Sequence, residues 1–411
     1  MQHFDVIIIG AGPSGSTAGA MLADAGKRVL SIEKQHFPRF TIGESLLPHC
    51  MEFLTIAGLE PAVQQQAELL GFQYKDGAAF LRRGMHTNFD FTKKFSSGPG
   101  TTFQVKRAQF DKLLADEAEK KGLEIRYGIT VTGFDNSAPA ITVLTVEDEQ
   151  GNSSQLSANF VLDASGFGRV LPRLLDLEVP SNFPVRQANF CHIKDGITSP
   201  TFDRNKILIT VHDQHQDVWF WLIPFSDGTA SFGVVGKAER FDSRLSAQEN
   251  LWQQLQQTPE LATLLSNAKP IREVRTLTGY SANVRQLYGK NYALLGNAGE
   301  FLDPVFSSGV TIALRSSVTA VRLVLRQLNG EQPDWEQEYS VPLRKGISTF
   351  RYFVEAWYDG RFQDVIFSSK RNDGVTAMIS AILAGYAWDE TNPYVAETER
   401  RMNVLREICI E

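Results

Sequence analysis

Gly10-Ala11-Gly12-Pro13-Ser14-Gly15 is the stretch that decides the fold of this 411-residue chain. The residues before it, Asp5 to Ile9, are nearly all β-branched, which predicts a parallel strand buried on both faces. Residues 16–26 predict an alanine-rich helix, and residues 29–32 predict a second strand. The three glycines of such a turn permit a tight turn, backbone contact with a pyrophosphate and close packing of helix on strand. The pattern predicts a dinucleotide-binding strand–turn–helix–strand unit.

Glu33 ends the second strand and completes this layout. A carboxylate at this place accepts hydrogen bonds from an adenosine ribose, and the helix start offers free N–H groups to phosphates. The predicted nucleotide contacts are therefore Gly10, Gly12, Pro13, Ser14, Gly15, Glu33 and the adjacent Lys34. The motif alone does not distinguish FAD from NAD, and a glycine-rich turn can also be an ordinary loop.

The composition argues against several classes of protein. The formal net charge is −6 and no basic run stands out, which argues against a nucleic-acid-binding surface. The three cysteines lack metal-ligand spacing, and so few thiols in so long a chain indicate a reducing compartment. No signal peptide is expected, nor an apolar run long enough to span a membrane. We therefore expect a cytoplasmic enzyme without a metal site.

A second ligand-binding turn is expected after a predicted hairpin at residues 141–162. Asp163-Ala164-Ser165-Gly166 follows its last strand directly, where ligands bind in a doubly wound sheet. Between residues 185 and 280 strand-like runs predict an antiparallel sheet. Trp219 and Trp221 share one face of a strand there, either as core packing or as substrate contacts.

Further segments carry candidate chemistry. Residues 71–80 alternate as in a strand with one wet face, so Lys75 is either a solvated lysine or, in a closed cavity, an amine with a shifted pKa. Residues 296–309 precede a predicted helix whose N-terminus can hold negative charge, including that of a reduced flavin ring. The C-terminal region is predicted to be helical. Its apolar residues 377–384 would pack on the sheet, line the site of an apolar substrate or contact a lipid surface.

Two longer motifs carry a family resemblance. Residues 39–48 resemble the loop R-F-x-I-G-E-S-L-L-P, and residues 296–309 resemble the signature G-D-A-A-x-x-x-D-P-x-x-S-x-G. The chain is similar to the FAD-dependent monooxygenase superfamily, and within it to the flavin-dependent halogenase and geranylgeranyl-reductase branch. The resemblance implies FAD as the cofactor and adds as contacts Arg39, Ser45, Arg107, Asp163, Gly166, Asn297, Asp303, Pro304, Gly309 and Val310.

The patterns and the resemblance together predict an α/β fold. A Rossmann-like FAD-binding domain, a parallel sheet with helices, would comprise residues 1–180 with 281–330 and carry substrate-domain insertions such as 71–105. An antiparallel substrate domain would occupy residues 185–280, and a helical C-terminal region would occupy 331–411.

Two features favour a halogenase within this branch. Residues 219–224 match its W-x-W-x-I-P motif, and Lys75 stands where the family's active-site lysine is expected. Family chemistry implies that reduced FAD and oxygen oxidise halide, and that the lysine positions or captures hypohalous acid beside an electron-rich ring. The expected substrate is a phenol, a pyrrole or a carrier-tethered group, with FADH2 supplied by a separate flavin reductase.

The halide would lie at a helix N-terminus, near Ser307, Ser308 and Gly309. The expected substrate pocket consists of Trp219, Trp221, Glu300 and Phe306. Glu300 would place negative charge close to the halide, and Asn297 replaces the usual aspartate of the G-D motif. The alternatives are an FAD-dependent reductase or dehydrogenase of an apolar unsaturated substrate, a non-halogenating monooxygenase, and a non-catalytic flavin-binding protein.

Overall fold

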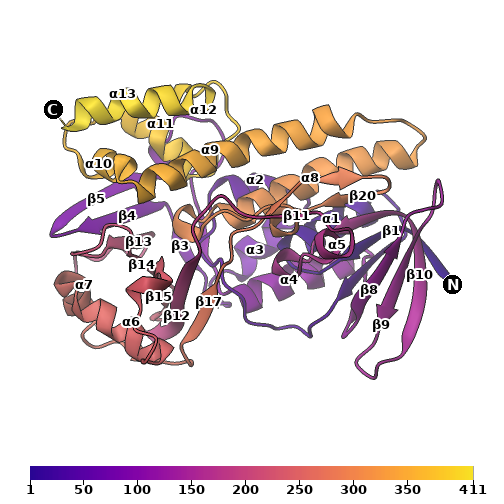
Figure 1. The fold of residues 1–411 in the computed structure, drawn as a ribbon, viewed down its shortest axis with the longest axis horizontal. Helices are drawn as coiled ribbons and strands as arrows, with labels where there is room; N and C mark the ends of the chain where they lie inside the picture. The colour runs from indigo at the N-terminus through magenta and orange to yellow at the C-terminus, as the bar shows by residue number, and fades with distance from the viewer. Residues whose placement is uncertain (411) are drawn as a thin grey trace.

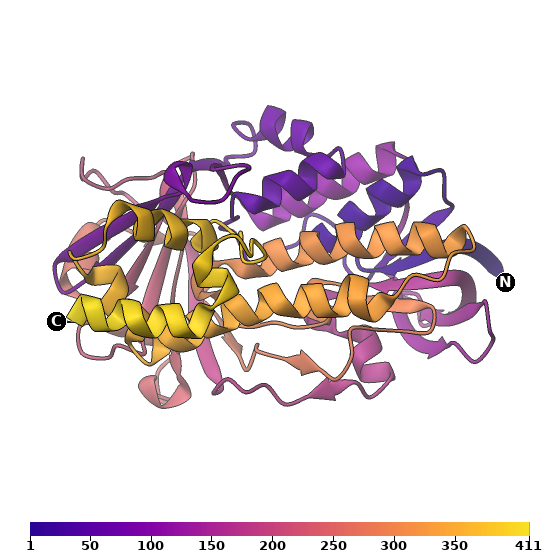
Figure 2. The same cartoon turned by 90° about the horizontal axis from the view of Figure 1, so that it is seen from above.

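The computed structural model describes residues 1–410. Two large sheets occupy opposite ends of an elongated molecule, and two long helices, α8 (Ser308–Leu328) and α9 (Val341–Tyr358), run along it (Figure 1). Seen from above, these helices lie side by side along the long axis, with the N-terminus at one end and the C-terminus at the other (Figure 2).

The first sheet contains the predicted dinucleotide-binding unit. Five of its eight strands run parallel in the order β20-β10-β1-β2-β7. Its elements are β1 (Gln2–Ile9), α1 (Pro13–Asp24), β2 (Val29–Glu33), α4 (Arg107–Lys120), β7 (Glu124–Tyr127), β8 (Thr130–Asp135), β9 (Thr142–Glu147), β10 (Ser153–Asp163), β19 (Tyr288–Gly289) and β20 (Tyr292–Leu294). Helix α1 begins at Pro13 rather than at the predicted Ser16, because proline suits the first helical position.

The carboxyl ends of three parallel strands meet at one edge of this sheet. Ile9 lies opposite Ile32 on one side and Asp163 on the other, and Asp163 lies opposite Leu294. The central strand β1 is buried on both faces, as its β-branched residues predict. The two predicted small-residue turns, which follow β1 and β10, are therefore neighbours in space.

The second sheet is mainly antiparallel, with the order β16-β12-β15-β14-β13-β4-β5, and β17 also pairs with β12. Its strands are β4 (Gly77–Arg82), β5 (Met85–Asp90), β12 (Arg186–Lys194), β13 (Lys206–Val211), β14 (Trp219–Pro224), β15 (Thr229–Lys237), β16 (Lys269–Pro270) and β17 (Arg275–Thr278). Strand β4 comes from the predicted insertion and runs parallel to β13. The antiparallel sheet predicted for residues 185–280 is present with this additional hairpin.

The prediction of a single strand at residues 71–80 is wrong, because the chain forms two separate strands there. The chain forms β3 (Gln73–Lys75), which pairs with β6 (Thr102–Gln104) in a separate ribbon, and then β4 in the second sheet. The break falls at Asp76, whose N–H donates to the Asn205 carbonyl and whose carboxylate pairs with Lys206 at 2.8 Å. These distant partners turn the chain from one sheet to the other.

Shorter elements surround the two sheets. They are α2 (His49–Ile56), α3 (Glu60–Gln66), η1 (Phe91–Lys93), η2 (Gly166–Gly168), α5 (Val170–Leu174), β11 (Glu178–Val179), η3 (Ala238–Arg240), α6 (Ala247–Gln256), α7 (Pro259–Leu264), β18 (Asn283–Val284), η4 (Gly296–Ala298), η5 (Pro304–Phe306) and the π-helical turn η6 (Glu336–Ser340).

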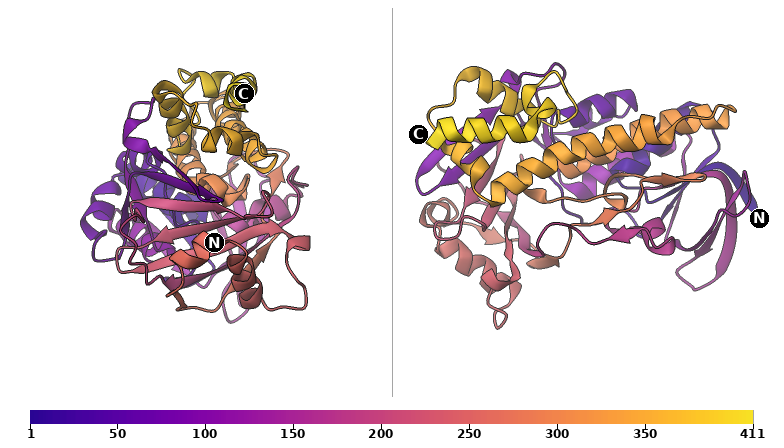
Figure 3. Two further views of the ribbon diagram at one scale, coloured as in Figure 1. Left: turned by 90° about the vertical axis from the view of Figure 1, so that its left-hand side faces the viewer. Right: turned by 45° about the horizontal axis from the view of Figure 1, so that its top comes forward.

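The C-terminal region is helical, as predicted. After α9 come α10 (Arg361–Phe367), α11 (Asp373–Leu383), α12 (Pro393–Ala396) and α13 (Thr398–Ile410). Helices α10 and α11 contact β5 and so cover the β4–β5 end of the second sheet, as two further views show (Figure 3). The apolar segment 377–384 lies within and just after α11.

One helix corrects an expectation about membrane-length segments. By length and composition α8 is apolar enough to cross a membrane, whereas no such segment is expected from the sequence. Two thirds of its most apolar 18-residue segment is buried inside the protein, where α8 packs on α1, α2 and α9. It has the environment of a core helix.

Candidate functional site

One cavity of about 400 Å³ runs from the carboxyl ends of β1 and β2 to the face of the second sheet. Most of the residues predicted to contact the cofactor line it: Gly10, Gly12, Pro13, Ser14, Glu33, Lys34, Arg39, Ser45, Arg107, Gly166, Asn297, Pro304, Gly309 and Val310. Trp219, Trp221 and Ser307 line it as well. The sequence patterns thus converge on a single site although they are far apart in the chain.

The glycine turn has the close contacts that its sequence predicts. Gly10 has a φ of +99°, and a Cβ added there would lie 2.7 Å from the Ala164 carbonyl oxygen. A Cβ on Gly15 would overlap the Gly10 carbonyl oxygen, so Gly15 packs behind the turn rather than lining the cavity. Only glycine fits at either position, and the N-terminus of α1 is thereby brought to the cavity wall.

Glu33 is buried and held by backbone donors on both carboxylate oxygens. Oε2 accepts from Ala11 N and Oε1 from Gln35 N, each at 3.0 Å. Each oxygen keeps a further lone pair for the cavity. The carboxylate is therefore oriented in advance for the hydroxyls of a ribose.

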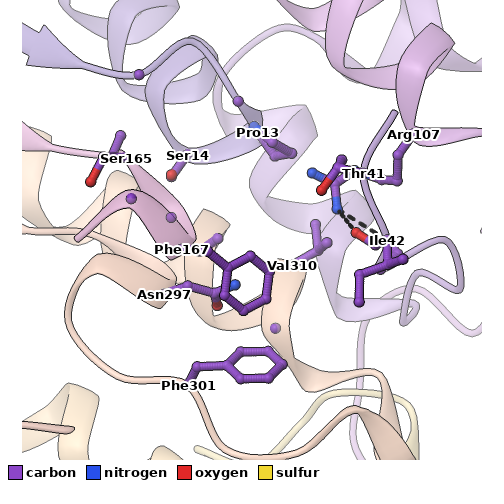
Figure 4. Close-up of a pocket in the computed structure, with 18 of the residues that line it drawn as sticks. Pro13, Ser14, Thr41, Ile42, Arg107, Ser165, Phe167, Asn297, Phe301 and Val310 are labelled. Atoms are coloured by element: carbon purple, nitrogen blue, oxygen red, sulfur yellow. Dashed lines mark hydrogen bonds between the residues drawn. The ribbon is translucent and has the colours of Figure 1, made fainter. Parts of the chain in front are cut away.

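Two arginines share one buried carboxylate beside this end of the cavity. Asp111 accepts from Arg39 Nη1 at 3.1 Å and from Arg107 Nε at 2.7 Å. Arg107 also donates to the Ile42 carbonyl (Figure 4). The buried Nε of Arg39 has no hydrogen-bond partner within residues 1–410. Arg39 Nη2 also lies 3.7 Å from Glu33 Oε2, so the two guanidinium groups face two carboxylates and offer N–H donors to a pyrophosphate rather than net charge.

Aromatic and small side chains line the next part of the cavity. The rings of Phe167 and Phe301 meet edge to face with centroids 5.1 Å apart, close to Asn297 and Val310 (Figure 4). Ser307 has a left-handed φ of +57° and turns the chain into α8, whose second and third residues, Gly309 and Val310, reach the cavity. Ser308 is buried and does not line the cavity. Of the predicted halide contacts, Ser307 and Gly309 therefore reach it.

Two predicted cofactor contacts are placed elsewhere. Asp163 accepts from Ser165 N and Leu171 N at 2.9 and 2.6 Å, so it holds the second turn from behind. Asp303 is buried and accepts from the hydroxyls of Tyr280 and Tyr358 at 3.4 and 3.0 Å. Burial raises the pKa of both carboxyl groups. Neither aspartate lines the cavity. The carboxylate of Asp163 is bonded to backbone N–H groups, and that of Asp303 is bonded to two tyrosine hydroxyls.

Apolar and neutral side chains make up most of the cavity end at the second sheet. Its residues there are Ala188, Ile207, Trp219, Trp221, Ile223, Ser231, Leu277 and Tyr280. Trp219 Nε1 donates to Tyr358 Oη at 2.9 Å and Trp221 Nε1 donates to Ser231 Oγ at 3.1 Å. Since both indole N–H groups are already bonded, the tryptophans present carbon to the cavity. Of the charged residues that line the cavity, Glu33, Lys34, Arg39 and Arg107 belong to the other end, whereas Glu44 pairs with His192 of β12 in the second sheet.

Lys75 lies at the end of β3 with 1% of its surface exposed. Its ammonium group donates to Ser45 Oγ at 2.8 Å and to the Leu46 carbonyl at 2.7 Å, and Nζ lies 5.6 Å from the centroid of the Phe91 ring. Burial lowers the pKa of Lys75 to about 7. The solvated-lysine interpretation is wrong. Lys75 does not line the cavity itself, but Ser45 does, so one hydrogen bond separates the amine from it.

The other two residues predicted for the substrate pocket lie outside the cavity lining. Glu300 is buried and pairs with Arg351 of α9, which neutralises the charge expected near the halide. Phe306 packs edge to face on Trp357 and Phe362. Both side chains fasten the segment before α8 to the C-terminal helices.

Sequence reasoning missed several groups around the cavity. Tyr280 and Tyr358 hold Asp303, and Glu44 pairs with His192 at 2.7 Å. Glu44 stands inside the quoted loop motif, so its position was readable as a candidate. The two tyrosines lie outside any motif and become visible only through their contacts.

The fold and the cavity define a class: a flavoprotein enzyme with a Rossmann-like domain whose cofactor cavity continues onto an antiparallel sheet. A family model described as an FAD binding domain matches residues 3–339, and the chain belongs to this family. The protein is thus an FAD-binding oxidoreductase, and the predicted cofactor and fold class are confirmed.

Similar proteins place it near the flavin-dependent halogenases. It is 28% identical to a 1H-pyrrole-2-carbonyl-[peptidyl-carrier protein] chlorinase of Pseudomonas fluorescens, covering 87% of this chain and 84% of the relative. It is 33% identical to a tryptophan 2-halogenase of Chondromyces crocatus, covering 79% and 62%. A crystal structure of a flavoprotein/dehydrogenase from Cytophaga hutchinsonii matches with 40% identity, 99% of each chain and a TM-score of 0.94.

Proposed function

We propose that this enzyme is a flavin-dependent halogenase that uses reduced FAD, oxygen and halide to halogenate a neutral, electron-rich aromatic substrate. The observation that carries the proposal is Lys75, a buried amine with a pKa of about 7 next to a flavin cavity. The relatedness to carrier-protein-linked pyrrole and tryptophan halogenases supports it.

The environment of Lys75 suits an amine that reacts with hypohalous acid. When bound, reduced FAD supplies the electrons with which oxygen converts halide to that acid. At neutral pH about half of the Lys75 side chains are uncharged. Their two N–H groups point at Ser45 and the Leu46 carbonyl, which leaves the nitrogen lone pair free to attack the halogen or to hold the acid.

The cavity supports a substrate without charge. The end at the second sheet offers carbon surfaces and two bonded indoles, so a free amino acid would leave its ammonium and carboxylate unpaired there. A phenol or a pyrrole fits this lining. A pyrrole held as a thioester on a carrier protein fits as well, because the ester removes the carboxylate. A separate flavin reductase supplies the reduced FAD.

The test is a turnover assay with the holoenzyme, a flavin reductase, NADH, oxygen and bromide. Phenols, pyrroles and indoles, free and carrier-bound, serve as substrates, and mass spectrometry detects the bromine isotope doublet. We expect a brominated product with wild-type enzyme and with Lys112→Met, a control on the exposed face of α4, but none with Lys75→Met. Bromination that survives Lys75→Met removes the lysine from the mechanism.

A second candidate function is reduction or dehydrogenation of an apolar unsaturated compound. The match to the flavoprotein/dehydrogenase of Cytophaga hutchinsonii favours it, as does the apolar cavity end. In the same assay this function predicts a flavin that is reduced and reoxidised without any halogenated product. Anaerobic conversion of an apolar alkene, with no need for halide, would then identify the reductase.

A further inference from the structure

A second cavity of about 190 Å³ lies beside the first, and one hydrogen-bonded pair of side chains joins their linings. It is lined by Phe40, Phe190, Cys191, His192, Arg272, Glu273 and Arg275. Arg272, Glu273 and Arg275 are exposed, so this cavity opens to solvent. His192 lines it from β12, and Glu44, the hydrogen-bond partner of His192, lines the flavin cavity.

The Glu44–His192 pair forms the partition between the two cavities. His192 Nε2 and Glu44 Oε1 are 2.7 Å apart, and both residues are buried. The edges of two aromatic rings, Phe40 and Phe225, pack on the imidazole with centroids 5.3 and 5.4 Å away. Nδ1 has no hydrogen-bond partner within residues 1–410. One ring nitrogen therefore faces the carboxylate, and the other is left for solvent in the second cavity.

The charged groups around this pair come from three segments. Arg272, Glu273 and Arg275 line the second cavity, with both guanidinium groups over the Phe40 ring at 5.0 and 5.2 Å. Lys106 Nζ lies 5.4 Å from the centroid of the Phe225 ring and pairs with Asp227. None of these charged side chains hydrogen-bonds to Glu44 or His192, so within the described residues the two side chains of the pair are bonded to each other alone.

We propose that His192 and Glu44 conduct protons from solvent into the flavin cavity. A water or buffer acid protonates Nδ1, Nε2–H passes its proton to the Glu44 carboxylate, and the carboxylic acid releases that proton into the cavity. The imidazole resets when its ring turns into the second cavity, where water supplies a proton to Nε2 and accepts the one on Nδ1, so one turn of the cycle moves one proton from solvent into the flavin cavity.

The chemistry of the cavity consumes protons. Conversion of FADH2, oxygen, halide, a proton and an aromatic C–H compound into FAD, a C–halogen compound and two waters consumes one proton for each halide anion. Reoxidation of the anionic reduced flavin by oxygen to FAD and hydrogen peroxide also consumes one. The inference rests on the proposed oxygen-dependent function, but the second reaction tests it without halide or substrate, so its failure is distinct from failure of halogenation.

The experiment measures reoxidation of the reduced holoenzyme by stopped-flow absorbance, with a pH-indicator dye following proton uptake. We expect His192→Ala to slow both signals about 10-fold or more, and His192→Gln, which keeps a donor to Glu44, to be equally slow. His86→Ala is the matched control, since His86 also pairs with a glutamate but lies on the opposite end of the same sheet. Its rate should equal the wild-type rate.

Added imidazole distinguishes conduction from a positioning role. His192→Ala leaves a space that opens to solvent, so imidazole should restore the rate, whereas pyrazole, of the same shape but far less basic, should not. In the protein without flavin, ligand-observed NMR should detect imidazole binding to His192→Ala and not to wild type. A wild-type rate in His192→Gln, rescue by pyrazole as well as imidazole, or absence of both binding and rescue would overturn the proposal.

Discussion

Replacing Lys75 by methionine should change how the stability of the protein depends on pH. Burial lowers the pKa of this ammonium group from 10.5 to about 7. Between these values the unfolded chain holds a proton that the folded chain has lost. Each pKa unit is worth about 1.4 kcal/mol, so the charged form is disfavoured in the folded state by about 5 kcal/mol.

The sign follows from proton linkage. Because the unfolded state binds more protons, raising the pH removes the penalty and the free energy of unfolding rises. Between pH 7 and pH 9 the wild-type enzyme should gain about 2 kcal/mol relative to Lys75→Met, and the gain should flatten above pH 10.5 and below pH 7.

Urea unfolding followed by circular dichroism, at half-unit steps from pH 6.5 to 9.5, measures this difference. Subtracting the two proteins cancels the titration of all other groups. Lys112→Met, an exposed lysine paired with Asp116, is the control and should follow wild type at every pH. If the free energies of unfolding of wild type and Lys75→Met changed in parallel with pH, Lys75 would not be a buried amine with a lowered pKa. The basis of the proposed function would then be lost.

Three further outcomes follow from the site. Gly15→Ala should weaken FAD binding about 10-fold or more in a fluorescence titration, because its Cβ overlaps the Gly10 carbonyl; unchanged affinity would contradict the turn geometry. Glu300→Ala should cost about 1–3 kcal/mol in urea unfolding by leaving the half-buried Arg351 unpaired, and Glu300→Leu with Arg351→Met should recover most of it. Bromination should increase with pH through about 7 as Lys75 loses its proton, so a rate that falls over this range would exclude the neutral amine.

The parts of the fold that could be predicted are those whose cause is local. The run from Asp5 to Ile9, the glycine turn and the helix after it carry their own strand, turn and helix preferences, and they form where expected. The cofactor end of the cavity was predictable for the same reason. Its residues belong to short motifs at strand ends and helix starts, and these positions converge whenever the sheet forms.

The remainder depends on partners far away in the chain. Asp76 breaks the segment 71–82 because its contacts are Asn205 and Lys206, which no local pattern connects to it. Glu300 loses its effect on the cavity because Arg351, on a C-terminal helix, neutralises it. The alternation around Lys75 suggested a solvated face, whereas tertiary packing buries the amine completely.

The break at Asp76 has a practical consequence for enzyme engineering. Lys206 holds Asp76, the neighbour of Lys75 in the chain, and the next residue, Ile207, lines the cavity. Libraries that randomise Ile207 to broaden substrate range will therefore also disturb the support of the reactive amine. Leu277 lines the same end from β17, which is not adjacent to β13 in the sheet. Diversity introduced at Leu277 can reshape the cavity while the amine keeps its place.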